Sequence, residues 1–215
     1  SSSDGRSLLG YSHGAAGIAA GLACGYSAFE DEAKQVLDIH TVVDGAFSFE
    51  EFCYDRFGLW PDFRTGMTSN AGPGTWCHGA AGIALARSVV DNAIGSSYSE
   101  SKYYDACVSK LRYEFSRGLM PYWNLSLCHG ALGNLEALRS GGRAEDKDLV
   151  GTIERQVLNH ITARGLPCGV PGGLEVPGLM SGLAGIGLGL LRFNGHTAGT
   201  PLLATFPDDD RSNLI

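Results

Sequence analysis

The stretch WCHGAAGIALAR at Trp76–Arg87 decides the fold, because the chain repeats its pattern three more times. The other copies are YSHGAAGIAAGL at Tyr11–Leu22, LCHGALGNLEAL at Leu127–Leu138 and LMSGLAGIGLGL at Leu179–Leu190. All four align without gaps on His or Ser followed by Gly-x-x-Gly, and small residues at helical spacing follow this core. The aligned first positions are His13, His78, His129 and Ser181. Four copies in register indicate one structural unit that is built several times.

The segments between the motifs are predicted to form longer amphipathic helices. Apolar residues recur at spacings of three and four from Asp105 to Phe115 and again from Leu149 to Ile161. A third and less regular helix is predicted over Glu30–His40. Strand alternation is absent almost everywhere, so we predict an all-α fold. Pairs of a small-residue inner helix and an amphipathic outer helix build either an open solenoid or a closed α/α toroid.

Composition narrows the classes of partner. The chain has 215 residues, of which 44% are hydrophobic and 18% charged, as in a single globular domain. A net charge of −7 without a run of Lys or Arg disfavours nucleic acid and anionic membranes as partners. No apolar stretch is long enough for stable membrane insertion. No signal peptide is visible, so we expect a cytoplasmic protein whose cysteines serve thiol or metal chemistry rather than disulfides.

Two Cys-His pairs stand at matched positions of the repeat. Cys77 precedes His78, and Cys128 precedes His129. The inner helices of a ring begin at the same end of its cavity, so these residues are expected to converge. Thiolate and imidazole are the ligands that Zn²⁺ prefers, and a catalytic zinc keeps one position open beside three protein ligands. The pattern predicts a zinc site, and it leaves open which histidine binds.

His13 occupies the same motif position but follows Ser12 instead of a cysteine. An imidazole without a neighbouring thiol is a candidate acid/base group, since its ordinary pKa lies near neutrality. The alternative is a histidine that caps a helix or orients another side chain. The cysteines outside the motifs are expected to have structural roles; they are Cys24, Cys53, Cys107 and Cys168. The histidines outside the motifs are expected to be solvated or packed; they are His40, His160 and His196.

The four motifs resemble those of the lanthionine synthetase C-like cyclases. The likeness rests on GYSHGAAG, TWCHGAAGI, SLCHGALGN and PGLMSGLAGIGLGLLR, and it is strongest toward the carboxy-terminal cyclase domain of class II lanthipeptide synthetases. This resemblance implies an α/α toroid with a central zinc, held by Cys77, Cys128 and His129. It also implies that His13 is the active-site histidine and that His78 lies near the metal as an orienting or acid/base group.

The resemblance further implies a reaction. A cysteine of a dehydrated precursor peptide binds the open zinc position and becomes a thiolate, which adds to dehydroalanine or dehydrobutyrine and closes a lanthionine or methyllanthionine ring. His13 is the first candidate to protonate the resulting enolate, and His78 is the second. A complete toroid of this family has more than four hairpins. Residues 1–215 are therefore expected to be the carboxy-terminal part of the cyclase domain, partnered by the rest of the barrel and a dehydratase domain upstream in the same synthetase.

Three other functions stay open at this point. A zinc-dependent thiol prenyltransferase also uses a helical ring, but it needs a carboxylate ligand, and no Asp or Glu lies at the ligand positions of the motifs. A non-catalytic module that holds zinc and binds thiols would differ from the cyclase only in lacking activity. A glycan-processing barrel needs two carboxylates across a cleft, whereas the candidate acids lie in predicted outer helices. Those acids are Glu30, Glu50, Glu51 and Asp55.

Overall fold

The computed structural model describes residues 7–29, 38–64, 74–119 and 124–193, and within these ranges it contains helices, turns and loops but no strand. The α-helices are α1 (Ala15–Ala28), α3 (Ile39–Phe57), α4 (Ala80–Ile94), α5 (Lys102–Ser116), α6 (Ala131–Ser140), α7 (Lys147–Arg164) and α8 (Leu183–Phe193). Short 3-10 helices are η1 (Tyr98–Glu100), η2 (Ala144–Asp146) and η3 (Pro171–Gly173). The all-α fold predicted from the sequence is confirmed.

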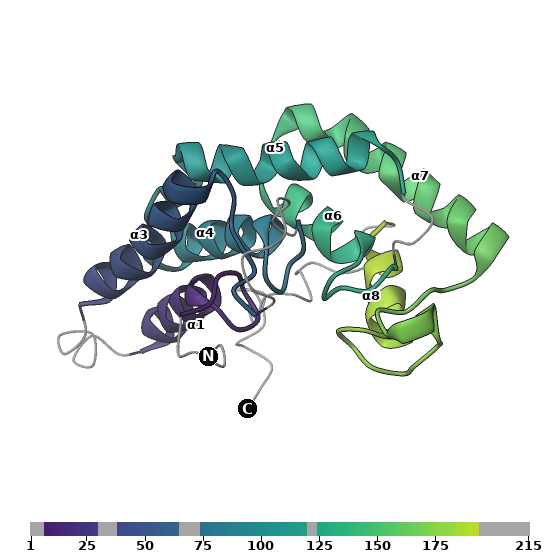
Figure 1. Ribbon diagram of the computed structural model, residues 1–215, viewed down its shortest axis with the longest axis horizontal. Helices are drawn as coiled ribbons and strands as arrows, with labels where there is room; N and C mark the ends of the chain where they lie inside the picture. The colour runs from purple at the N-terminus through teal and green to yellow at the C-terminus, as the bar shows by residue number, and fades with distance from the viewer. Residues whose placement is uncertain (1–6, 30–37, 65–73, 120–123, 194–215) are drawn as a thin grey trace, which may run out of the picture.

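The helices form two rows that curve together as an arc (Figure 1). Helices α1, α4, α6 and α8 each follow a repeated motif and make the inner row, while α3, α5 and α7 cover it from outside. Within the inner row α4 packs on α1 and α6, and α6 packs on α8. Each outer helix packs on the inner helix before it in the chain, α3 on α1, α5 on α4 and α7 on α6. This alternation is that of an α/α toroid, with α1 and α8 at the two ends of the described arc.

The outer helices each bury one face, and two of them begin with a side-chain N-cap. Helix α5 buries Tyr104, Cys107, Val108, Leu111 and Phe115, which is the stripe that the spacing predicts. Side chains cap two of these helices, since Asp38 accepts from the N–H of Thr41 and Ser101 accepts from the N–H of Tyr104. Helices α5 and α7 include the two predicted segments. Most of the predicted helix Glu30–His40 lies outside the described residues, and α3 begins at Ile39.

The inner helices pack through small side chains. Helix α1 buries Ala16, Ala19, Ala20 and Ala23, all without exposed area. Short side chains let α1 approach both α3 and α4, which explains why the motifs continue into Ala and Gly rather than into large apolar residues. Among the described residues, no helix combines the length and the hydropathy that a bilayer crossing requires. The six cysteines are all free thiols.

Candidate metal centre

Backbone hydrogen bonds join the four motifs in chain order. The N–H of Ser12 donates to the carbonyl of Cys77 at 3.1 Å, that of Cys77 to Cys128 at 3.2 Å, and that of Cys128 to Met180 at 2.9 Å. These four residues hold the same place in their motifs, directly before the motif His or Ser. The ladder gathers the four loops at one end of the inner row. It therefore brings Cys77 and Cys128 side by side although a whole repeat separates them in the sequence.

The second glycine of each motif makes this loop geometry possible. A Cβ at Gly17, Gly82, Gly133 or Gly185 would lie 1.8 to 1.9 Å from the carbonyl oxygen of the first motif residue of the same copy. The chain thus folds back so closely onto the first turn of each inner helix that no side chain fits there. The requirement is the same in all four copies, so this glycine is part of the repeat for a steric reason.

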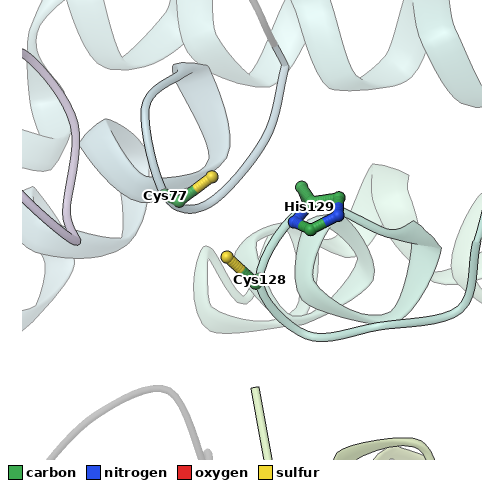
Figure 2. A group of neighbouring side chains, drawn as sticks. All are labelled: Cys77, Cys128 and His129. Atoms are coloured by element: carbon green, nitrogen blue, oxygen red, sulfur yellow. The ribbon is translucent and has the colours of Figure 1, made fainter. Parts of the chain in front are cut away.

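Three of the side chains singled out in the sequence meet at this end of the inner row. Cys77 comes from the loop before α4, and Cys128 and His129 come from the loop before α6 (Figure 2). Their candidate ligand atoms, two sulfurs and an imidazole nitrogen, all lie within 4.8 Å of one another. Cys77 is buried, Cys128 is half-buried and His129 is exposed. Two thiols and one imidazole at this separation fit a Zn²⁺ site with three protein ligands.

The fourth motif, which has no cysteine or histidine, supports His129. The backbone N–H of Gly169 donates to the carbonyl of Ser181 at 2.7 Å, and the imidazole of His129 donates to the backbone of Gly169. The Nε2 edge of the ring faces Gly169, since a Cβ on that glycine would lie 2.9 Å from Nε2. This arrangement leaves Nδ1 as the nitrogen that can take a metal. A hydrogen bond from the second ring nitrogen to a carbonyl is the usual way in which a metal-binding histidine is oriented.

The two thiols of the cluster shift each other's pKa in opposite directions. A hydrogen bond from Cys128 is the main reason why the pKa of Cys77 is lowered to about 4, and further hydrogen bonds from His129 and Thr75 act in the same direction. The same interaction raises the pKa of Cys128 well above its usual range. The pair therefore loses its first proton readily and its second only with difficulty. A dication between the sulfurs would replace that second proton, which is how thiol sites couple metal binding to deprotonation.

His13 and His78 lie together beside the cluster. Their rings stack with centroids 5.3 Å apart and an angle of 25° between planes. His13 is exposed, whereas His78 is buried, and burial lowers the pKa of His78. His78 therefore remains neutral at a lower pH than an ordinary histidine. The three-residue cluster contains His129 and not His78. The geometry therefore favours His129 as the metal-binding histidine, which the repeat pattern alone left undecided.

A sequence model described as "Lanthionine synthetase C-like protein" matches residues 1–200. The chain belongs to the lanthionine synthetase C-like family. The family expected from the motifs is thus confirmed. The chain is also 30% identical, over 198 residues, to the lacticin 481/lactococcin biosynthesis protein LcnDR2 of Lactococcus lactis subsp. lactis. That match covers 87% of this chain and 20% of the relative.

A solved structure titled nisin cyclase has the same fold as this lanthionine synthetase C-like chain. The TM-score is 0.60 at 20% sequence identity, over 89% of this chain and 47% of the cyclase. This likeness supports the toroid fold. The chain spans a fifth of the length of the curated relative and about half of the length of the solved cyclase.

Sequence reasoning missed one charged pair near the thiols of this family member. Arg64 donates from Nε to Oδ1 of Asp62 at 2.9 Å and from Nη2 to Oδ2 at 2.6 Å. The hydrogen bond with Asp62 is the main reason why the pKa of Arg64 is raised, and the charges of both cluster thiols act in the same direction. After burial, the Arg64 charge also lowers the pKa of His78. The pair follows α3 and lies outside every repeat, so motif alignment could not find it. A signal that could have found it is the Asp-x-Arg spacing, which suits a two-point contact between carboxylate and guanidinium.

The remaining cysteines and histidines of the described chain lie outside the cluster. Cys53 and Cys107 are buried in α3 and α5, and burial raises the pKa of both thiols, as expected for inert core cysteines. Cys168 is buried in a loop, and Cys24 is half-buried on α1. His40 and His160 lie at or within outer helices, and His196 lies outside the described residues.

Proposed function

We propose that the chain is the carboxy-terminal part of a zinc-dependent lanthipeptide cyclase, with Cys77, Cys128 and His129 as the zinc ligands. The observation that carries the proposal is the approach of two sulfurs and one imidazole nitrogen, from two repeats, to within 4.8 Å of one another. Membership of the lanthionine synthetase C-like family supports the same function. When bound, zinc would lower the pKa of a peptide thiol in its open position and hold it as a thiolate.

The reaction joins a cysteine of a dehydrated precursor peptide to its dehydroalanine or dehydrobutyrine. A carbon–sulfur bond forms at the β-carbon, the π electrons of the double bond move toward the α-carbon and its carbonyl, and a proton is delivered to the α-carbon. Atoms are only rearranged, so the peptide mass does not change. Two thiolate ligands from the protein would leave the bound sulfur electron-rich enough to attack, as expected for a soft site.

We assign the proton transfer to His13 first and to His78 second. His13 is exposed at the same end of the inner row as the cluster, where a peptide can reach it. His78 stacks on it at 5.3 Å, and its lowered pKa keeps it neutral near pH 7. The buried ring of His78 can orient the imidazole of His13 through this stacking contact. Arg64 adds a positive charge near the cluster thiols, which favours their thiolate forms.

The proposed partners are the dehydrated precursor peptide and the upstream part of the same synthetase. The chain corresponds to about half of a solved cyclase and a fifth of a curated relative, which supports a further set of hairpins and a dehydratase domain in the complete protein. A cytoplasmic location stays a prediction from the sequence.

Metal analysis of cysteine variants tests this function. We expect one zinc per chain in the wild type and a loss or strong weakening of zinc binding in Cys77→Ala and Cys128→Ala. Cys24→Ala is the matched control, because this thiol is half-buried and lies outside the cluster. Thioether formation in a dehydrated precursor peptide should follow zinc content, seen as loss of alkylatable thiol at constant mass. Full zinc occupancy in both cluster variants would remove the proposal.

A zinc-dependent prenyltransferase is the main enzymatic alternative. Its metal site needs a carboxylate, and the cluster found among the described residues contains two cysteines and a histidine but no Asp or Glu. Product mass separates the two reactions, because ring closure leaves the mass unchanged and prenyl transfer adds an isoprenoid.

A module that binds zinc and thiols without catalysis is the non-enzymatic alternative. It would show zinc binding in the complete protein but would form no thioether in a dehydrated precursor peptide.

A further inference from the structure

One buried carboxylate of the outer row reaches the first motif, whose loop carries His13 and supplies no side chain to the thiol cluster. Glu50 of α3 has no exposed area. Its Oε1 accepts two hydrogen bonds, from the N–H of Gly10 at 3.3 Å and from the N–H of Ala16 at 3.2 Å. These two amides lie on either side of the loop that carries His13. A single oxygen atom therefore ties both ends of this loop to the outer helix.

The first loop differs from the second and third in how its side chains are held. The second and third motifs contribute Cys77, Cys128 and His129, so a metal in the cluster would hold both of those loops. The first motif has Ser12 at the cysteine position, and backbone bonds join it to the second motif, from Tyr11 to Trp76 at 3.4 Å and from Ser12 to Cys77 at 3.1 Å. Glu50 adds a restraint from a side chain of α3.

A buried positive charge lies near Glu50. The guanidinium of Arg87 is fully buried, stacks over the ring of Phe47 at 4.4 Å from its centroid, and is bound by Glu51 at 3.2 Å. Burial raises the pKa of Glu50 to about 7, and the charge of Arg87 together with the two loop N–H groups opposes that rise. Burying a carboxylate costs free energy, and one oxygen of Glu50 accepts hydrogen bonds from both ends of the loop. Such a side chain is well suited to fixing the position of the loop.

We propose that Glu50 is a positioning residue, which holds the His13 loop through Oε1 so that the His13 imidazole stays stacked on His78. This inference rests on the proposed function, since the effect on ring closure is transmitted through His13. It assigns to Glu50 a hydrogen-bonding role and not a charge role. Displacement of a catalytic group by about 1 Å can reduce a rate on the order of a hundredfold.

Two conservative variants of Glu50, made in the complete synthetase, distinguish the effect of the Oε1 position from the effect of the negative charge. Glu50→Gln keeps an oxygen at the Oε1 position but removes the charge, whereas Glu50→Asp keeps the charge but is one methylene too short to reach both amides. We expect kcat for ring closure to stay within about threefold of wild type in Glu50→Gln and to fall at least about tenfold in Glu50→Asp. KM and zinc content should be unchanged in both. Glu51→Asp is the control, since Glu51 contacts Arg87 and not the loop.

Amide hydrogen exchange supplies a readout that does not depend on catalysis. Exchange in the segment 8–16 should become faster in Glu50→Asp and remain slow in Glu50→Gln, while the segment 126–134 of the third motif stays unchanged as an internal reference. A wild-type synthetase that closes no rings would defeat the proposed function, yet this exchange experiment would still test the loop restraint.

Each combination of results decides the inference. The inference is supported if Glu50→Gln keeps both the wild-type kcat and the slow amide exchange of the loop, while Glu50→Asp loses both. The reverse pattern would mean that charge matters, and equal behaviour of the two variants would mean that Oε1 has no separate role. Either of these outcomes overturns the proposal.

Discussion

The two cluster thiols are unlike ordinary cysteines because each changes the proton affinity of the other. Cys77 has a pKa lowered to about 4, chiefly through its hydrogen bond with Cys128, whose own pKa is raised. The metal-free pair therefore loses its first proton more readily than an ordinary thiol does, which favours binding of a dication. Free cysteine, with an ordinary pKa near about 8.5, would be mostly uncharged at neutral pH.

Thiolate absorbance of the metal-free protein should therefore rise in two well-separated steps. The first step is expected below the ordinary thiol range and belongs to the Cys77–Cys128 pair. Cys128→Ala should move this step upward, because the largest cause of the lowered pKa is then lost. Cys53→Ala is the control and should leave the first step in place, since Cys53 is buried elsewhere and has a pKa raised to about 11. A wild-type titration without a step below the ordinary range would contradict this account.

At the level of single residues, the repeated motifs predicted the thiol cluster but not the residues around it that lie outside the motifs. Cys77 and Cys128 could be found because the repeat aligns them, and aligned positions of a ring converge. The alignment left open which histidine joins them, and the family resemblance pointed to His129. The Asp62–Arg64 pair and Glu50 could not be found this way, since each lies between motifs and acts through contacts that depend on how α3 packs. The role of Gly169 depends on the fourth motif lying beside the third, which the sequence alone does not specify.

Among the structural elements, the inner helix start is the most constrained unit of the molecule. The starts of α1, α4 and α6 each combine an extended glycine directly before the helix, a second glycine against a carbonyl, and a ladder bond to the next motif. These features serve backbone contacts, so they tolerate little change in side-chain size.

Gly17→Ala should be strongly destabilising. Its Cβ would lie 1.8 Å from the carbonyl oxygen of Tyr11, so the loop that carries His13 would have to move. We expect a loss of about 2 kcal/mol or more in the free energy of unfolding, as for overpacked core positions. Gly45→Ala is the control within the exposed part of α3, where no atom lies within 4 Å of an added Cβ. That change should stabilise by roughly 0.5–1 kcal/mol.

Urea unfolding of both variants measures this difference. A Gly17→Ala protein as stable as Gly45→Ala would show that the loop can relax at little cost, contrary to the steric argument.

The elements that the sequence predicted best were those with a clear period. Helices α5 and α7 include the predicted segments because their apolar residues recur at three and four. Helix α3 was harder to predict, since its buried face includes Glu50 and its apolar stripe is therefore interrupted. A buried acid resembles a solvated one in the sequence, and only the two amides it meets reveal the difference.

At the scale of the whole molecule, the arc has two apolar ends. Helix α1 exposes 62% of Ile18 and 39% of Leu22, and Phe29 directly after it is 56% exposed, although the other face of the helix is packed against α3 and α4. At the other end, α8 exposes 49% of Leu191. Exposed apolar side chains gathered on one helix face indicate a contact surface. In the proposed complete synthetase, the remaining hairpins of the toroid would cover these faces.

Ile18→Ser combined with Leu22→Ser should therefore have opposite effects in two settings. In the isolated chain the double variant should increase soluble yield and change the free energy of unfolding by no more than about 0.5 kcal/mol per site, as usual for surface positions. In the complete synthetase it should lower the unfolding temperature and slow ring closure, because a covered apolar contact is then lost. Leu158→Ser is the matched control, since Leu158 is 50% exposed on the outer helix α7. A double variant that leaves the complete synthetase as stable and active as the Leu158→Ser control would show that the α1 face is not where the ring closes.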